Sequence, residues 1–330
     1  MKEIDLYPLK FDPIYQYRIW GGRRLGEVLS SPLPIDGPIG EAWILSDRDD
    51  HMSRVANGPL KGQSLGQLFE NFPEQLLGKL AGRFSRFPLL LKFLDAKEML
   101  SVQVHPTDTH IDLLPAGETG KTEAWVVLEA TKDSRIYAGL KPGTNVANLR
   151  KALADEKVAD KLTYFTPKSG DGVFIPAGTV HSLGNDVVVF EVQENSDVTF
   201  RLYDWNHVDA KTGKPRTLQI EQAISCIDFS QGAVGLVVPV VEEVKPVLRE
   251  RLFLCEHFGL WRLTSESKFK VGEAGMPHVL ICISGKGQLK HGSENYAVDK
   301  GDVMLLPAVV GVCDFLPSNE VCLLEITLPV

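Results

Sequence analysis

Residues 170–177 read Gly-Asp-Gly-Val-Phe-Ile-Pro-Ala, and residues 301–308 read Gly-Asp-Val-Met-Leu-Leu-Pro-Ala. In both stretches the Gly-Asp pair favours a tight turn, the apolar run that follows is typical of a buried strand, and Pro-Ala ends that strand. A turn and strand that recur in the same frame indicate a repeated structural unit. We therefore predict two related β-barrel modules, and with them a mainly β fold.

The two copies differ in the residues that follow them. The first continues as Gly-Thr-Val-His, which places His181 just past the end of the strand, whereas the second continues as Val-Val-Gly-Val and offers no metal ligand. A metal site is therefore expected in the first module only. The Pro- and charge-containing stretch 239–246 is expected to join the modules, so that one domain spans residues 1–238 and the other residues 239–330.

Local patterns outside the repeat predict mostly strands, with a few helical insertions. Short β-branched or aromatic runs predict strands at 135–138, 172–175, 187–193, 198–203, 278–283 and 321–328. Apolar residues at helical spacing predict a helix over 64–80 that Pro73 breaks in two, and another over 145–162. A short third helix over 218–227 would begin at Thr217 as its N-cap.

The composition excludes several classes of protein. A chain of 330 residues with 44% hydrophobic and 24% charged residues is typical of a globular protein, and its net charge of −8 argues against general nucleic-acid binding. The first 13 residues carry acids and no apolar core, so they do not resemble a signal peptide, and the longest apolar run, 232–241, is too short to cross a membrane. The five cysteines form no CxxC pair, which favours reduced thiols in a cytoplasmic protein.

The segment 100–106, Leu-Ser-Val-Gln-Val-His-Pro, is the strongest local signal for chemistry. In a strand, alternation places Ser101, Gln103 and His105 on one face and the two valines on the other. If the valines face a core, the polar side chains line an interior. Burying them without partners would cost roughly 1–3 kcal/mol each, so water, a ligand or a metal must satisfy them.

Two further elements complete a candidate metal site. Lys121, Glu123 and Trp125 alternate on one face of a second predicted strand, and His181 ends a third. Two imidazoles, a carboxylate and an amide oxygen suit a borderline ion such as Zn²⁺, and the lack of thiolates is typical of a catalytic rather than a structural site. Iron or manganese would accept the same ligands, so the sequence leaves the identity of the ion open.

The remaining histidines are not expected to bind the ion. His110, His207, His257 and His291 lie in polar, loop-like contexts that predict solvated side chains, and His51 and His278 are left unassigned.

The stretch 189–205 predicts a hairpin in which Glu191 and Arg201 face each other. Two interpretations stay open: a buried ion pair that holds the hairpin together, or a fixed arginine cation directed at charge on a substrate.

These motifs together resemble a known family. Ser-x-Gln-x-His-Pro, Lys-x-Glu, Gly-Asp-x(4)-Pro-Ala-Gly-x-x-His and Glu-x(9)-Arg occur in the order found in type I mannose-6-phosphate isomerases, and shorter agreements at 20–22 and 40–43 add to the likeness. The resemblance spans most of residues 15–206 and is strongest to the short bacterial form, in which a catalytic cupin, a jelly-roll β-barrel, precedes a second cupin-like domain.

The resemblance implies a role for each matched residue. The zinc ligands, one ion per chain, fall on Gln103, His105, Glu123 and His181. The family's active-site arginine falls on Arg201. Ser101 and Lys121 match positions that handle substrate and phosphate, and Glu191 matches an acid that lines the pocket. Lys92, Lys97 and Arg23 are further cations whose roles the sequence does not rank.

The implied reaction interconverts mannose 6-phosphate and fructose 6-phosphate by proton transfer between C1 and C2 through an enediol or enediolate. A water molecule on the metal, Glu191 and Lys121 remain candidates for the base. Two alternatives also stay open: an Fe²⁺-dependent cupin oxygenase, and a non-catalytic sugar-binding regulator. The sequence predicts a phosphorylated hexose as substrate and neither a nucleic acid nor a membrane as partner; it does not predict the oligomeric state.

Overall fold

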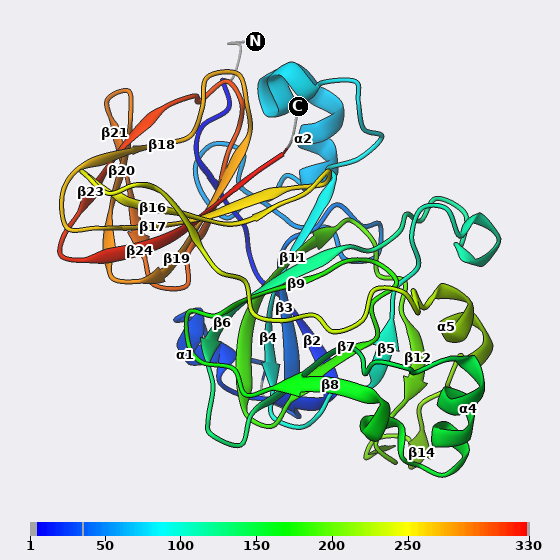
Figure 1. Ribbon diagram of the computed structural model, residues 1–330. Coiled ribbons are helices and arrows are strands. Elements are labelled where there is room, and N and C mark those ends of the chain that lie inside the picture. The colour runs from blue at the N-terminus through cyan, green and yellow to red at the C-terminus, as the bar shows by residue number, and fades with distance from the viewer. Residues whose placement is uncertain (1–4, 35, 329–330) are drawn as a thin grey trace.

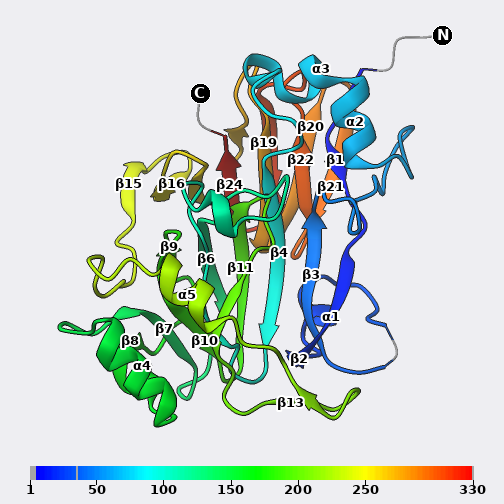
Figure 2. The same cartoon turned by 90° about the vertical axis from the view of Figure 1, so that its right-hand side faces the viewer.

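The computed structural model describes residues 5–34 and 36–328 and is mainly β, as predicted (Figure 1). Four larger sheets form two pairs, one pair in each half of the chain (Figures 1 and 2). The sheets are separate and do not close into barrels by continuous hydrogen bonding, so the predicted barrels are open, two-sheet structures. Of the first 13 residues, which do not resemble a signal peptide, residues 1–4 lie outside the described residues.

The first pair of sheets carries the candidate residues. The six-stranded sheet runs, in order, β2 (Ile14–Gly22), β3 (Ile39–Leu45), β4 (Leu89–Ala96), β11 (Val187–Glu194), β6 (Glu123–Glu129) and β9 (Gly172–Ile175). The five-stranded sheet runs β12 (Phe200–Tyr203), β5 (Val102–Val104), β10 (His181–Gly184), β7 (Arg135–Leu140) and β8 (Leu162–Phe165). A small ribbon pairs β13 (Val208–Asp209) with β14 (Lys214–Pro215).

The second pair lies above the first in Figure 2. Its larger sheet runs β1 (Leu9–Lys10), β22 (Val303–Leu306), β19 (His278–Ser284), β24 (Val321–Thr327), β17 (Gly259–Ser265), β16 (Leu248–Leu254) and β15 (Val240–Glu243). The smaller runs β18 (Phe269–Val271), β23 (Cys313–Pro317), β20 (Lys286–His291) and β21 (Glu294–Asp299).

The helices follow two of the three predictions closely. They are α1 (Leu25–Val28), α2 (Leu65–Asn71), α3 (Pro73–Leu77), α4 (Val146–Ala154) and α5 (Ile220–Cys226), with 3-10 turns η1 (Gly78–Leu80), η2 (Ile111–Leu113) and η3 (Val158–Lys161). Pro73 divides the first predicted helix as expected, and α5 starts at Ile220 with Gln219, not Thr217, as its N-cap. The helix predicted over 145–162 is wrong beyond Ala154, because Glu156 has a positive φ of 56° and breaks it.

The repeated Gly-Asp turns adopt the same structure in both halves. Gly170 and Gly301 have φ values of 89° and 91°. The carboxylates of the two aspartates accept backbone hydrogen bonds at equivalent places, Asp171 from Lys168 at 2.7 Å and Asp302 from Asp299 at 2.8 Å. Each turn then leads into a strand, β9 paired with β6 and β22 paired with β19. The sequence repeat is therefore a structural repeat.

The two halves share a hydrophobic core. The N-terminal strand β1 pairs with β22, so Leu9 lies opposite Leu305 in the C-terminal sheet. Helix α3 and the 3-10 turn η1 also bond to that half, through Leu76 O to Ala308 N at 3.0 Å and Lys79 N to Gly275 O at 3.1 Å. Strand β15 lies inside the stretch predicted to join the modules. The division at residue 238 stays a prediction, and its ends at 1–4 and 329–330 lie outside the described residues.

Within the described residues, no helix combines the length and the apolar character needed to cross a membrane.

A comparison of the two turn glycines tests how the repeat supports the fold. A Cβ on Gly301 would lie 2.1 Å from Val28 O and 2.9 Å from Leu29 Cα, whereas a Cβ on Gly170 would meet only Arg262 Nη1, at 3.4 Å. Both substitutions by alanine strain the backbone by about 1–3 kcal/mol. We expect Gly301→Ala to lower the urea midpoint and the melting temperature clearly more than Gly170→Ala, because fixed backbone atoms must move. Equal losses would contradict this packing.

Candidate active site

The candidate residues lie between the two sheets of the N-terminal half, beside a cavity of about 420 Å³ that is lined by Ser101, Gln103, Lys121, Glu191 and Arg201. The other candidate ligands, His105, Glu123 and His181, contact the lining residues Gln103 and Lys121. Strands β5, β10 and β12 of the five-stranded sheet carry or adjoin Gln103, His181 and Arg201. Strands β6 and β11 of the six-stranded sheet carry Glu123 and Glu191. Two sheets that face each other thus supply opposite walls of one site.

Strand register places three of these residues side by side. Gln103 lies opposite His181 on one neighbouring strand and opposite Arg201 on the other. Residues directly opposite each other in a sheet project from the same face. Val102 and Val104 are fully buried in a hydrophobic core on the other face, which confirms the predicted alternation.

The centre of the site is a carboxylate between two imidazoles. His105 Nε2 lies 3.3 Å from Glu123 Oε2, and His181 Nε2 lies 3.3 Å from Glu123 Oε1. One ligand atom from each of the three residues lies within 4.8 Å of the others, and all three side chains are buried. The structure therefore brings together three of the four predicted metal ligands in an arrangement that suits one cation.

Backbone carbonyls orient both imidazoles. His105 Nδ1 lies 2.9 Å from Val198 O, and His181 Nδ1 lies 2.9 Å from Thr179 O. Each Nδ1 then carries the proton and each Nε2 lone pair faces the centre, the tautomer that a metal ligand needs. Burial lowers the pKa of both rings, that of His181 to about 3, so both are neutral at pH 7.

The buried Glu123 carboxylate has one cation beside it. Lys121 Nζ lies 2.6 Å from Oε2 and 3.2 Å from His105 Nε2, although within the described residues neither carboxylate oxygen has a hydrogen bond of good geometry. Burial would raise the pKa of Glu123, but Lys121 and His105 hold it well below its usual value, so the buried carboxylate is ionised. An ionised carboxylate beside two neutral imidazoles is a donor set that suits a divalent ion.

Gln103, the fourth predicted ligand, turns its amide nitrogen to the centre in this structure. Its Nε2 lies 3.2 Å from His181 Nε2, and its Oε1 accepts a hydrogen bond of 3.2 Å from Ser101 Oγ. Amide oxygen and nitrogen exchange places when the group turns by half a revolution. As a ligand, Gln103 would present Oε1 to the centre and donate from Nε2 to Ser101.

Glu191 does not pair with Arg201. Its Oε2 accepts a hydrogen bond of 2.8 Å from Trp125 Nε1, and its Oε1 lies 3.7 Å from Lys92 Nζ. The predicted hairpin is wrong, because β11 and β12 belong to different sheets. Burial, and then the charge of Glu123, raise the pKa of Glu191 to about 7.

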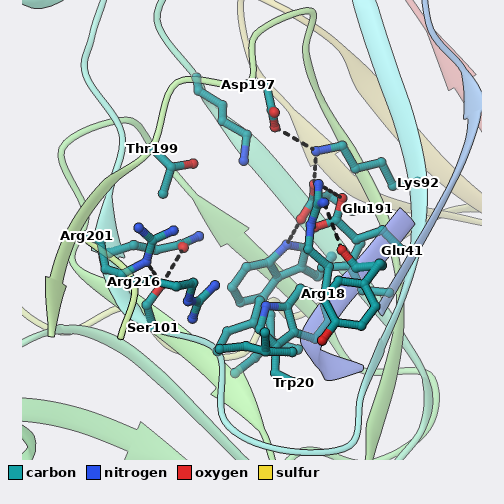
Figure 3. A pocket seen from close by; sticks show the side chains of 18 of the residues that line it. Arg18, Trp20, Glu41, Lys92, Ser101, Glu191, Asp197, Thr199, Arg201 and Arg216 are labelled. Atoms are coloured by element: carbon teal, nitrogen blue, oxygen red, sulfur yellow. Dashed lines mark hydrogen bonds and ion pairs between the residues drawn. The ribbon is translucent and has the colours of Figure 1, made fainter. Parts of the chain in front are cut away.

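Arg201 is a cation without an acidic partner. It donates to Ser101 Oγ at 3.2 Å and to Thr217 O at 2.9 Å, and within residues 5–34 and 36–328 no carboxylate forms a salt bridge with it. Figure 3 shows Arg216 beside it, on the side of the pocket opposite Glu191 and Lys92. Burial, and then the charge of Arg216, lower the pKa of Arg201. Two adjacent guanidinium groups, of which Arg216 pairs with the Asp204 carboxylate and Arg201 with none of the described acids, favour an anion.

Sequence reasoning missed most of the charged pairs around this pocket. Arg18 forms a bidentate pair with Glu41, at 2.9 and 3.0 Å, and Arg216 pairs with Asp204. Of the three unranked cations, Lys92 lines the pocket and lies 3.5 Å from Asp197. The other two lie elsewhere: Lys97 pairs with Asp186, and Arg23 donates to backbone carbonyls near Pro34.

Two of the histidines expected to be solvated are partly buried and paired. His207 is 18% exposed and lies 3.5 Å from a carboxylate oxygen of Glu98, and His257 is 24% exposed and lies 3.3 Å from one of Glu194. His278, left unassigned, is buried in the C-terminal half and contacts Glu325 at 3.0 Å. None of these three joins the metal-binding cluster.

Comparisons with known proteins agree with this geometry. Residues 8–142 match the phosphomannose isomerase type I catalytic domain. The chain is 36% identical to the mannose-6-phosphate isomerase ManA of Bacillus subtilis over 92% of this chain and 94% of that protein, and 33% identical to the mannose-6-phosphate isomerase of Streptococcus mutans over 95% and 96%. The crystal structure of the mannose 6-phosphate isomerase from Bacillus subtilis superimposes with a TM-score of 0.88 at 29% identity, covering 97% of this chain and 99% of that one. The chain therefore belongs to the family of type I mannose-6-phosphate isomerases, also called phosphomannose isomerases.

Proposed function

We propose that this enzyme interconverts mannose 6-phosphate and fructose 6-phosphate with one zinc ion held by Gln103, His105, Glu123 and His181. The observation that carries the proposal is the buried Glu123 carboxylate between two imidazoles whose Nε2 atoms face it. The similar proteins named above are isomerases, which favours this activity over the oxygenase and the regulator considered from sequence.

A divalent cation bound there would supply Lewis-acid stabilisation of negative charge on the sugar oxygens O1 and O2. Arg201, for which the described residues offer no salt-bridge partner, would bind the anionic substrate together with Arg216 and stabilise the charge that develops on its oxygens in the transition state. Ser101, which contacts both Arg201 and Gln103, would donate to a substrate oxygen and hold its neighbours in place.

Glu191 is the proton carrier that the environment favours. A group with a pKa near the working pH accepts and returns a proton most efficiently, and burial brings Glu191 to about 7. Lys121 is less suitable, because Glu123 and Glu191 raise its pKa and it keeps its proton. Lys92 and Trp125 orient the Glu191 carboxylate from two directions.

A coupled assay with mannose 6-phosphate tests the activity and its metal dependence together. We expect turnover by the purified protein, loss of turnover after chelation, and recovery with Zn²⁺. His181→Ala should lose bound metal and activity in parallel, with metal affinity falling by more than the roughly 10–100-fold typical of changes outside the ligand shell.

His291→Ala, outside the metal-binding cluster, is the matched control and should keep both metal and activity. Zero turnover by the metal-replete wild type would remove the isomerase proposal. Stoichiometric zinc in folded His181→Ala would remove His181 from the ligands.

Arg201→Ala tests the role of Arg201, which pairs with no acid among the described residues. We expect kcat to fall by roughly 10²–10³-fold with metal content unchanged, on the scale of one lost electrostatic contact to developing charge. Arg201→Lys should recover only part of the rate, since a lysine keeps the charge but not the planar fork. Arg150→Ala, which removes an exposed pair with Glu221, should be neutral. A near-normal rate for Arg201→Ala would make this residue structural.

The pH dependence tests Glu191 as the base. A base must be deprotonated to accept a proton. Because the pKa of Glu191 is raised from 4.5 to about 7, kcat/KM should fall as the pH drops below about 7 instead of below 4.5. Glu191→Gln should lower kcat by roughly 10²–10⁴-fold and abolish this acid limb, whereas Glu98→Gln, at an exposed carboxylate, should keep it. An acid limb that persists unchanged in Glu191→Gln would exclude Glu191 as its source.

A further inference from the structure

One tight turn of the C-terminal half lies near the strands that carry the candidate site. The hairpin of β16 and β17 closes at residues 255–258, where Cys255 N donates to Phe258 O at 3.0 Å. Phe258 is fully buried in the same core cluster as Val126 of β6 and Val192 of β11. The buried ring therefore anchors the turn in the core to which β6 and β11, the strands that carry Glu123 and Glu191, also contribute side chains.

The turn places His257 on a carboxylate at the end of β11. His257 Nδ1 lies 3.3 Å from Glu194 Oε2, and Glu194 is 7% exposed. The other oxygen, Oε1, accepts a hydrogen bond of 2.7 Å from Thr122 N, and Glu194 N donates to Thr122 O at 3.2 Å. One carboxylate thus joins the C-terminal half to the residue directly before Glu123.

The hydrogen bonds between Glu194 and Thr122 lie just beyond the end of the pairing between β6 and β11. Glu123 is the first residue of β6, and Glu123 with Gln193 is the last residue pair of these two strands. A strand end frays when its backbone groups lack partners, and a hydrogen bond to a carboxylate is about twice as strong as a neutral one. By accepting from Thr122 N, the Glu194 side chain extends the pairing of β6 with β11 by one residue, to Thr122. The Thr122 hydroxyl accepts from Ala177 N at 3.4 Å, in the loop that leads to His181.

We propose that Glu194 and His257 are positioning residues through which the C-terminal half holds the Glu123 carboxylate between the two imidazoles. Glu194 fixes the Thr122 backbone, and His257 fixes Glu194. The half of the protein without a predicted metal site then contributes to metal binding in the other half. The inference rests on Glu123 being a metal ligand, as proposed above.

The test compares metal binding in Glu194→Ala, Glu194→Gln and His257→Ala with the wild type. Zn²⁺ affinity is measured by chelator competition, ligand geometry by the visible absorption of the Co²⁺-substituted protein, and catalysis by kcat and KM. We expect Glu194→Ala to weaken Zn²⁺ binding by roughly 10–100-fold, alter the Co²⁺ spectrum and lower kcat more than it raises KM. Glu194→Gln keeps an acceptor for Thr122 N and should recover most of the affinity.

His257→Ala should weaken Zn²⁺ binding less than Glu194→Ala, and adding it to Glu194→Ala should have no further effect, because it acts through that carboxylate. Since His257 is partly exposed, this variant keeps the inference testable if Glu194→Ala does not fold. Glu266→Gln, at an exposed acid outside these contacts, is the control.

Unchanged Zn²⁺ affinity and Co²⁺ spectrum in folded Glu194→Ala or His257→Ala, with only the melting temperature lowered, would overturn the inference. A wild type that binds zinc but does not isomerise mannose 6-phosphate would contradict the proposed activity and leave the positioning role standing. A wild type that binds neither ion would overturn both.

Discussion

The site depends on one buried charge, the Glu123 carboxylate. No part of Glu123 is exposed, and the nearest polar groups are two neutral imidazoles and the Lys121 ammonium. An ionised carboxylate in such an environment is stable only beside a cation. Lys121 is one such cation, 2.6 Å from Oε2. The two Nε2 atoms, held at 3.3 Å from the carboxylate oxygens by rings that a backbone carbonyl fixes from behind, form with Glu123 a donor set that suits a second cation, a metal ion.

The two-sheet construction explains how charges of opposite sign coexist in a small space. One sheet carries the acids Glu123 and Glu191, and the other carries the row Arg201, Gln103 and His181. Because the sheets pack face to face, Arg201 stays apart from Glu191, which pairs with Lys92 instead. An arginine that is not neutralised by the protein remains able to bind an anionic substrate. In the proposed function, the separation of β11 and β12 into different sheets keeps Arg201 available to the substrate.

Local sequence patterns predicted the features that depend on local geometry. Alternation along 101–105, the two Gly-Asp turns and the break at Pro73 follow from strand period, turn chemistry and proline, and all are present. The pairs Arg18–Glu41 and His257–Glu194 join segments from different strands and turns, and no local period encodes such contacts. The 189–205 hairpin failed for the same reason: the polar turn after Glu194 is compatible with a reversal into the same sheet or a crossing to the opposite one.

X-ray absorption at the zinc edge of the purified protein tests the metal site most directly. Two imidazole nitrogens at about 2.0–2.1 Å with the remaining ligands oxygen are expected for an ion bound by His105, His181, Glu123 and Gln103. A spectrum with sulfur in the first shell, or with fewer than two imidazoles, would contradict the arrangement on which the proposed chemistry depends.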